Sequence, residues 1–142
     1  MLILTILFIC VLIIVSIQDI TGMEIANWCH AAIAALAIVS VLVFGSPTYS
    51  SCIAGAFCVS VPMLLIALIS RGAFGGGDIK LMAAGGMFLG VRAVLASAVA
   101  AVFLGGIYSL YLLIVKRSAR KTSFAFGPFL CAGMIAGQLF FR

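Results

Sequence analysis

The sequence predicts an all-α fold: a polytopic bundle of about six transmembrane helices that forms one membrane-embedded domain, residues 1–142. Of the 142 residues, 66% are hydrophobic and only 8% are charged, whereas a soluble domain carries charge on about a quarter of its residues. The apolar residues fall in long uncharged runs, and short connectors between these runs hold most of the charge. The lipid bilayer is therefore the expected solvent.

The runs are matched to spans by length, because a membrane helix needs about 20 mostly apolar residues. Residues 1–18 carry no charge and predict the first span. The uncharged stretch 25–70 is long enough for two spans, and the turn signal Gly45-Ser46-Pro47 divides it into spans near 27–44 and 51–69. Residues 93–115 and 122–141 predict two more spans. The stretch 81–91, between Lys80 and Arg92, covers only about half a bilayer, so the total is six spans with it and five without it.

The basic residues favour six spans. The connectors at 19–26, 70–80 and 116–123 then share one side of the membrane, and the opposite side holds only Arg92 and Arg142. The shared side carries the remaining six basic residues: Arg71, Lys80, Lys116, Arg117, Arg120 and Lys121. Because basic residues concentrate in cytoplasmic loops, these connectors are expected to be cytoplasmic, with both termini outside. The net charge of +5 thus indicates membrane orientation rather than binding to nucleic acid.

Two further residue classes have structural interpretations. Gly86 and Gly90, like Gly133 and Gly137, are four positions apart and predict faces where helices approach closely. The five cysteines form no CxxC pair and are interpreted as small core residues. The single histidine, His30, has no second ligand at metal-binding spacing, so no metal site is predicted.

Only three residues are acidic: Asp19, Glu24 and Asp78. Acids at membrane spans are costly and usually functional, and the topology puts all three on the cytoplasmic side. Asp19 is expected directly after the first span and Asp78 directly before the short fourth one, after three glycines that predict irregular backbone with room for an extended peptide. Two alternatives remain open from the residues alone. The aspartates could be a helix stop and an ion-pair partner of Lys80 or Arg71, or they could be the relay of a proton or cation carrier.

Three motifs resemble the type IV prepilin peptidase family, membrane aspartyl proteases of the GxGD class. Gly75-Gly76-Gly77-Asp78-Ile79-Lys80-Leu81 resembles the GxGD segment, and Asp19 followed eight positions later by Asn27 resembles the first-aspartate motif. Phe126-Gly127-Pro128-Phe129 resembles a late FGPF-type motif, so that the resemblance covers essentially the whole chain. Ala26 stands where the family usually has proline. The N-terminal segment with cysteine pairs that larger members carry is not in the sequence, so the chain is similar to the compact peptidases of Flp (Tad) pili, and N-methylation is not expected.

The resemblance implies an aspartic endopeptidase that cuts the basic leader from prepilins or pseudopilins at the cytoplasmic face of a bacterial inner membrane, without a metal or cofactor. Asp19 and Asp78 would be the catalytic residues, which share a proton and titrate as a unit. Six other residues are expected to shape the site or bind substrate: Gly75, Gly77, Lys80, Asn27, Glu24 and Pro128. The alternatives are a small ion-coupled transporter or channel subunit, and a non-catalytic scaffold subunit. The sequence leaves the oligomeric state open.

Overall fold

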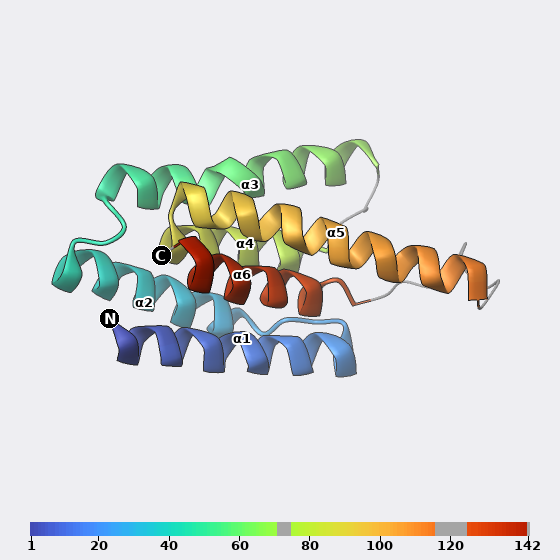
Figure 1. Ribbon diagram of the computed structural model, residues 1–142, viewed down its shortest axis with the longest axis horizontal. Helices are drawn as coiled ribbons and strands as arrows, with labels where there is room; N and C mark the ends of the chain where they lie inside the picture. The colour runs from blue at the N-terminus through green and yellow to red at the C-terminus, as the bar shows by residue number, and fades with distance from the viewer. Residues whose placement is uncertain (71–74, 116–124, 142) are drawn as a thin grey trace.

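The computed structural model describes residues 1–70, 75–115 and 125–141, which form six helices and no strand. The helices are α1 (Leu2–Gly22), α2 (Asn27–Phe44), α3 (Tyr49–Ile69), α4 (Gly76–Leu89), α5 (Val91–Val115) and α6 (Gly127–Phe141). Their axes run roughly along the long direction of the molecule, and both chain termini lie at one end of the bundle (Figure 1). The predicted all-α bundle is confirmed.

The helix lengths divide the bundle into two classes. Four helices, α1, α2, α3 and α5, are long and apolar enough to cross a membrane, so the chain is a multi-pass membrane protein. The other two, α4 and α6, have 14 and 15 residues. Chain termini at the same end of the bundle agree with an even number of membrane crossings. Six full spans remain a prediction. The basic residues at 71, 116–121 and 142 on which it depends lie outside the described residues.

Two helix boundaries differ from the predicted spans. The first helix continues four residues past Gln18 and ends where Met23 adopts left-handed backbone (φ 52°) and donates its N–H to the Asp19 carbonyl at 3.0 Å. Asp19 is therefore inside α1, not after it, because helical hydrogen bonding is stable until a residue leaves the helical conformation. The last helix begins at Gly127, and the predicted start at 122 lies outside the described residues.

Helix α4 lies at the centre of the bundle and packs against α2, α3, α5 and α6. Its length, about 21 Å at 1.5 Å per residue, is less than the roughly 30 Å hydrocarbon core. The neighbours cover most of it, and its buried residues include Leu81, Met82 and Phe88. The Phe88 ring stacks on Phe8 of α1 with centroids 4.3 Å apart. From Leu81 to Leu89 the helix is thus surrounded mainly by protein, while Gly76 and Lys80 near its start are exposed.

Glycines let the helices approach to backbone contact. A Cβ on Gly55 of α3 would meet the Gly86 carbonyl of α4, and a Cβ on Gly86 would meet the Gly55 carbonyl. Gly133 and Gly137 of α6 lie in the same way against the backbone of α5. The predicted close approach is confirmed for these glycines and also for Gly90, whose backbone carbonyl carbon lies 3.0 Å from where a Cβ on Gly55 would be. Gly90 ends α4 with positive φ (79°), a conformation that side chains with a Cβ rarely adopt.

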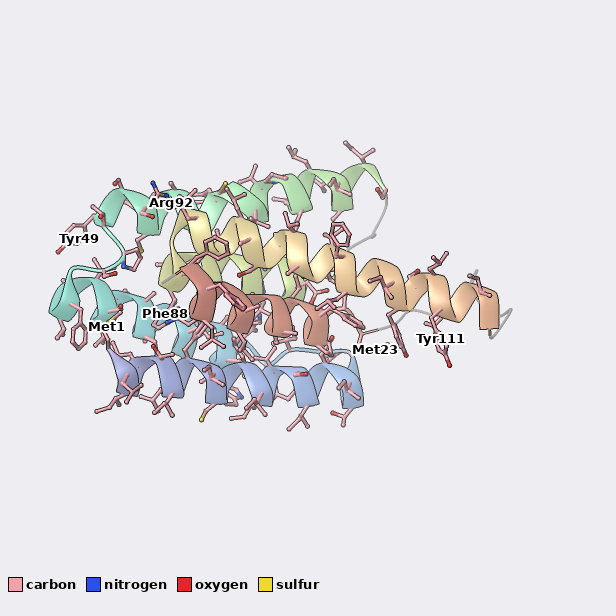
Figure 2. The ribbon with its side chains drawn as sticks, in the orientation of Figure 1. Met1, Met23, Tyr49, Phe88, Arg92 and Tyr111 are labelled. Carbon is pink, nitrogen blue, oxygen red and sulfur yellow. The ribbon has the colours of Figure 1, made fainter. Side chains whose placement is uncertain are left out.

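The two ends of the bundle carry different residues. Figure 2 shows Tyr49 and Arg92 at the end that holds Met1, and Met23 toward the other end. Large apolar side chains cover much of the outer surface, including Leu42, Phe57 and Phe103. Buried hydroxyls bond to backbone carbonyls: Ser97 donates to Ala93 of its own helix at 2.7 Å, and Ser40 of α2 donates to Ser46, beyond the end of its helix, at 2.6 Å. The end near Met23 is where α1 finishes and α4 and α6 begin, and it contains both aspartates.

Candidate active site

Asp19 lies in the last turn of α1 and is only 6% exposed. Its Oδ2 accepts a hydrogen bond of 2.8 Å from the backbone N–H of Gly127, 108 residues away. Gly127 is the first residue of α6, where backbone N–H groups have no partner within the helix and the helix dipole favours negative charge. The start of α6 therefore orients and stabilises the Asp19 carboxylate.

The FGPF segment explains why this contact forms. A Cβ on Gly127 would lie 2.5 Å from Asp19 Oδ2 and 2.9 Å from its Cγ, so only glycine leaves room for the carboxylate. Pro128 follows as the second residue of α6, a position that tolerates the missing N–H and suits the fixed φ of proline. The adjacent N–H of Phe129 is directed to the Phe126 carbonyl at 3.1 Å. Gly127 is thus a site residue that the sequence analysis did not select.

Asp78 is the third residue of α4 and is 8% exposed. Its carboxylate bonds back to the N–H of Gly75, which caps the helix with extended backbone (φ −66°, ψ 142°). This is the geometry of a capping box, in which the third residue returns to the N-cap. The prediction of irregular backbone is wrong for Gly76 and Gly77, which form the first turn of α4. The aspartate stabilises that turn, and none of the three glycines has positive φ.

The two carboxyl groups, Asp19 and Asp78, are close enough for their charges to interact. They come from different helices, and each lies at a helix N-terminus: Asp19 against the start of α6, and Asp78 in the first turn of α4. Two carboxylates that repel each other and are shielded from water do not ionise together easily, so the pair is suited to hold one proton between them. The buried thiol of Cys131, on α6, also lies within electrostatic range of both.

The remaining predicted residues lie around this pair. The Lys80 ammonium donates to the side-chain carbonyl of Asn27 at 3.5 Å in an exposed position. The alternative pairing of Asp78 with Arg71 falls outside the described residues. Glu24 is exposed in the connector between α1 and α2. Within the described part of the chain, no hydrogen bond or ion pair joins Lys80, Asn27 or Glu24 to the carboxyl pair.

The start of α2, with Ile25 just before it, contacts the start of α4. The Ile25 side chain lies 3.4 Å from where a Cβ on Gly77 would be, and His30 Nε2 is 3.1 Å from the Gly77 carbonyl oxygen. Gln18, next to Asp19, accepts from the Ala26 N–H at 3.3 Å and faces the Cys29 thiol at 3.5 Å. The sequence analysis did not predict Gln18, Ile25 or His30 as site residues, because only the fold brings them close to the site.

Other possible sites do not compete with the carboxyl pair. A groove of about 270 Å³ between α3, α5 and α6 includes Phe126 and Leu130 but no acidic or basic side chain. Among residues 1–70, 75–115 and 125–141, no three His, Cys, Asp and Glu side chains are grouped so as to hold a metal ion. The prediction that the chemistry uses no metal or cofactor stays a prediction.

Comparisons with known proteins identify the family. Residues 6–110 match the model of the type IV leader peptidase family. The chain is 31% identical over 135 residues to a protein of Bacillus subtilis (strain 168) named prepilin leader peptidase/N-methyltransferase. The match covers 95% of this chain and 54% of that protein, so the chain spans about half the length of the curated relative. No solved structure matches it. The chain belongs to the type IV leader peptidase family.

Proposed function

We propose that this chain is an aspartic endopeptidase that removes the basic leader peptide from prepilins or pseudopilins, with Asp19 and Asp78 as its catalytic pair. The observation that carries the proposal is the meeting of two buried, electrostatically coupled carboxyls from separate helices in a membrane protein of this family. A prepilin substrate is named for the Bacillus relative. We extend the substrate, but not N-methyl transfer, to this chain.

The proposed mechanism uses one carboxyl as base and the other as acid. The ionised carboxylate takes a proton from water while the water oxygen attacks the scissile carbonyl carbon. The protonated carboxyl donates its proton to the carbonyl oxygen, which gives a neutral tetrahedral diol. Collapse of the diol returns a proton to the amine leaving group and breaks the C–N bond. The backbone N–H groups of Gly127 and Gly75 favour one negative charge on the pair.

The cleavage site is proposed to face the cytoplasm of a bacterial inner membrane. Met23 lies toward the end of the bundle opposite Tyr49 and Arg92 (Figure 2), Asp19 is in the helical turn just before it, and Asp78 is in the first turn of α4. Helices α3 and α5 end on that side (Figure 1), and Arg71 and the basic residues within 116–121 follow them in the sequence. Basic connectors are retained in the cytoplasm. A leader with basic residues would remain on the same side, while the hydrophobic stretch behind it enters the bilayer.

The test is cleavage of a precursor by membrane vesicles that contain the chain. Inverted vesicles, which expose the cytoplasmic face, should cut an added precursor with a basic leader, and sealed right-side-out vesicles should not. Asp19→Asn and Asp78→Asn should each lower the rate by at least about 10³-fold, because acid–base catalysis contributes about 10²–10⁴-fold. Both variants should still insert. Normal cleavage by either Asn variant would remove the pair from the mechanism.

The ion-coupled transporter and the scaffold subunit predict different outcomes. A carrier would leave the precursor intact and would move protons across vesicles in a manner that requires Asp78. A scaffold would show neither activity. A chelator should leave cleavage unchanged if the chemistry uses only the carboxyl pair.

A further inference from the structure

His30 is a buried histidine that the acid–base mechanism does not use. It lies in the first turns of α2 and faces the beginning of α4. Its Nε2 is 3.1 Å from the carbonyl oxygen of Gly77, the residue before Asp78. Its Nδ1 is buried and has no hydrogen-bond partner among the described residues.

The partner of Nε2 determines which nitrogen carries the proton. A carbonyl oxygen can only accept, so Nε2 must be the N–H donor. In the neutral ring Nδ1 is then a bare acceptor. A proton on Nδ1 would be a buried donor without a partner among the described residues, which is unfavourable. His30 is therefore a donor through Nε2 to the backbone of the GxGD segment.

The start of α2, which carries His30, is also hydrogen-bonded to the residue before Asp19. Gln18 precedes Asp19 and accepts the N–H of Ala26, at the N-cap of α2. One turn later, His30 donates to Gly77. A short path of polar contacts thus runs from the end of α1, through the start of α2, to the start of α4. It joins the residues adjacent to Asp19 and Asp78.

We propose that His30 is a positioning residue, whose Nε2–H bond to the Gly77 carbonyl holds the first turn of α4 and so sets Asp78 at its working distance from Asp19. The inference rests on the proposed function for its kinetic consequence but not for the hydrogen bond itself. His30 does not touch substrate or reacting atoms in this role. It acts on catalysis through the backbone next to Asp78.

A matched pair of variants separates positioning from packing. In His30→Gln the amide nitrogen occupies about the place of Nε2 and can still donate to Gly77. In His30→Asn the shorter side chain puts its amide near the place of Nδ1 and cannot reach. Both replacements are neutral and polar, so a residue that only fills space would respond similarly to both. Ile33→Val, a mild change at a buried residue of the same helix, is the packing control.

We expect His30→Gln and Ile33→Val to keep kcat for precursor cleavage within about threefold of the parent. His30→Asn should lower kcat by about 10²-fold with little change in KM, since misplacing a catalytic group by about 1 Å costs about that factor. Backbone amides at residues 78–82 should exchange with deuterium faster in His30→Asn only. Equal kinetics and equal exchange in the Gln and Asn variants would overturn the proposal.

Two results keep this inference distinct from the proposed function. If the parent chain shows the expected amide exchange but never cleaves a precursor, the peptidase function is rejected and the His30–Gly77 contact is retained. If His30→Asn does not insert into the membrane, the tautomer of the imidazole ring in the parent chain is the test instead. Its signals are unambiguous, because the chain has one histidine. Nitrogen-15 NMR of labelled histidine should show a proton on Nε2 and none on Nδ1. The opposite tautomer would contradict the inference.

Discussion

Asp19 and Asp78 are buried to nearly the same extent but are held in different ways. Asp78 is positioned locally: it caps its own helix through Gly75, three residues earlier. Asp19 lies at the C-terminal end of α1, the less favourable end of a helix for a negative charge. Its donor is instead the N-terminus of α6, 108 residues away. One aspartate therefore depends on a motif and the other on the packing of the whole bundle.

Of the two ways of holding an aspartate, the distant contact is expected to be the more sensitive to substitution. Gly127→Ala would put a methyl group 2.5 Å from Asp19 Oδ2, so the carboxylate must move and lose its 2.8 Å hydrogen bond. We expect kcat to fall by about 10²-fold, as for other misplaced catalytic groups. Gly106→Ala is the control, because a Cβ there meets nothing within 4 Å. Equal activity of the two variants would show that α6 does not hold Asp19.

A smaller effect is expected on the locally held side. A Cβ on Gly77 would lie 3.4 Å from Ile25, so the extra methyls of Gly77→Val would push α2 and α4 apart. Overpacking of this kind costs about 1–3 kcal/mol, and we expect cleavage to fall by about tenfold. Gly76→Ala should stay close to the parent, because a Cβ at Gly76 meets open space. Thermal unfolding in detergent, measured beside precursor cleavage, separates lost fold from lost turnover.

The smallest effects are expected at the exposed residues near the pair. Glu24→Gln and Lys80→Ala should each change the cleavage rate by less than about threefold, since exposed polar contacts contribute about 0–1 kcal/mol. The bond between Lys80 and Asn27 is long, at 3.5 Å, and is open to water. Initial rates over a range of precursor concentrations would test this. A rise in KM for Glu24→Gln alone would instead identify Glu24 as a contact for the basic leader.

The comparison also shows where prediction from sequence succeeds. The span predicted near residues 27–44 coincides with α2, because the turn at Gly45 divides the long uncharged stretch where the helix ends. The predicted end of the first span at residue 18 is four residues early, because the charge of Asp19 ends the uncharged run but not the helix. In the structure the Asp19 side chain leaves the lipid by pointing into the bundle. A hydropathy pattern records which residues are charged but not which way they face.

The sequence by itself determined the fold class, the family and the two acids of interest. Long apolar runs can satisfy their backbone only as helices in lipid, and acids are too costly there to be incidental. Only the tertiary structure decided that Gly127 holds Asp19 and that His30 holds Gly77. These contacts join residues 108 and 47 positions apart. They depend on how close the helices pack, which is set where glycines of facing helices meet and not by any local pattern in the chain.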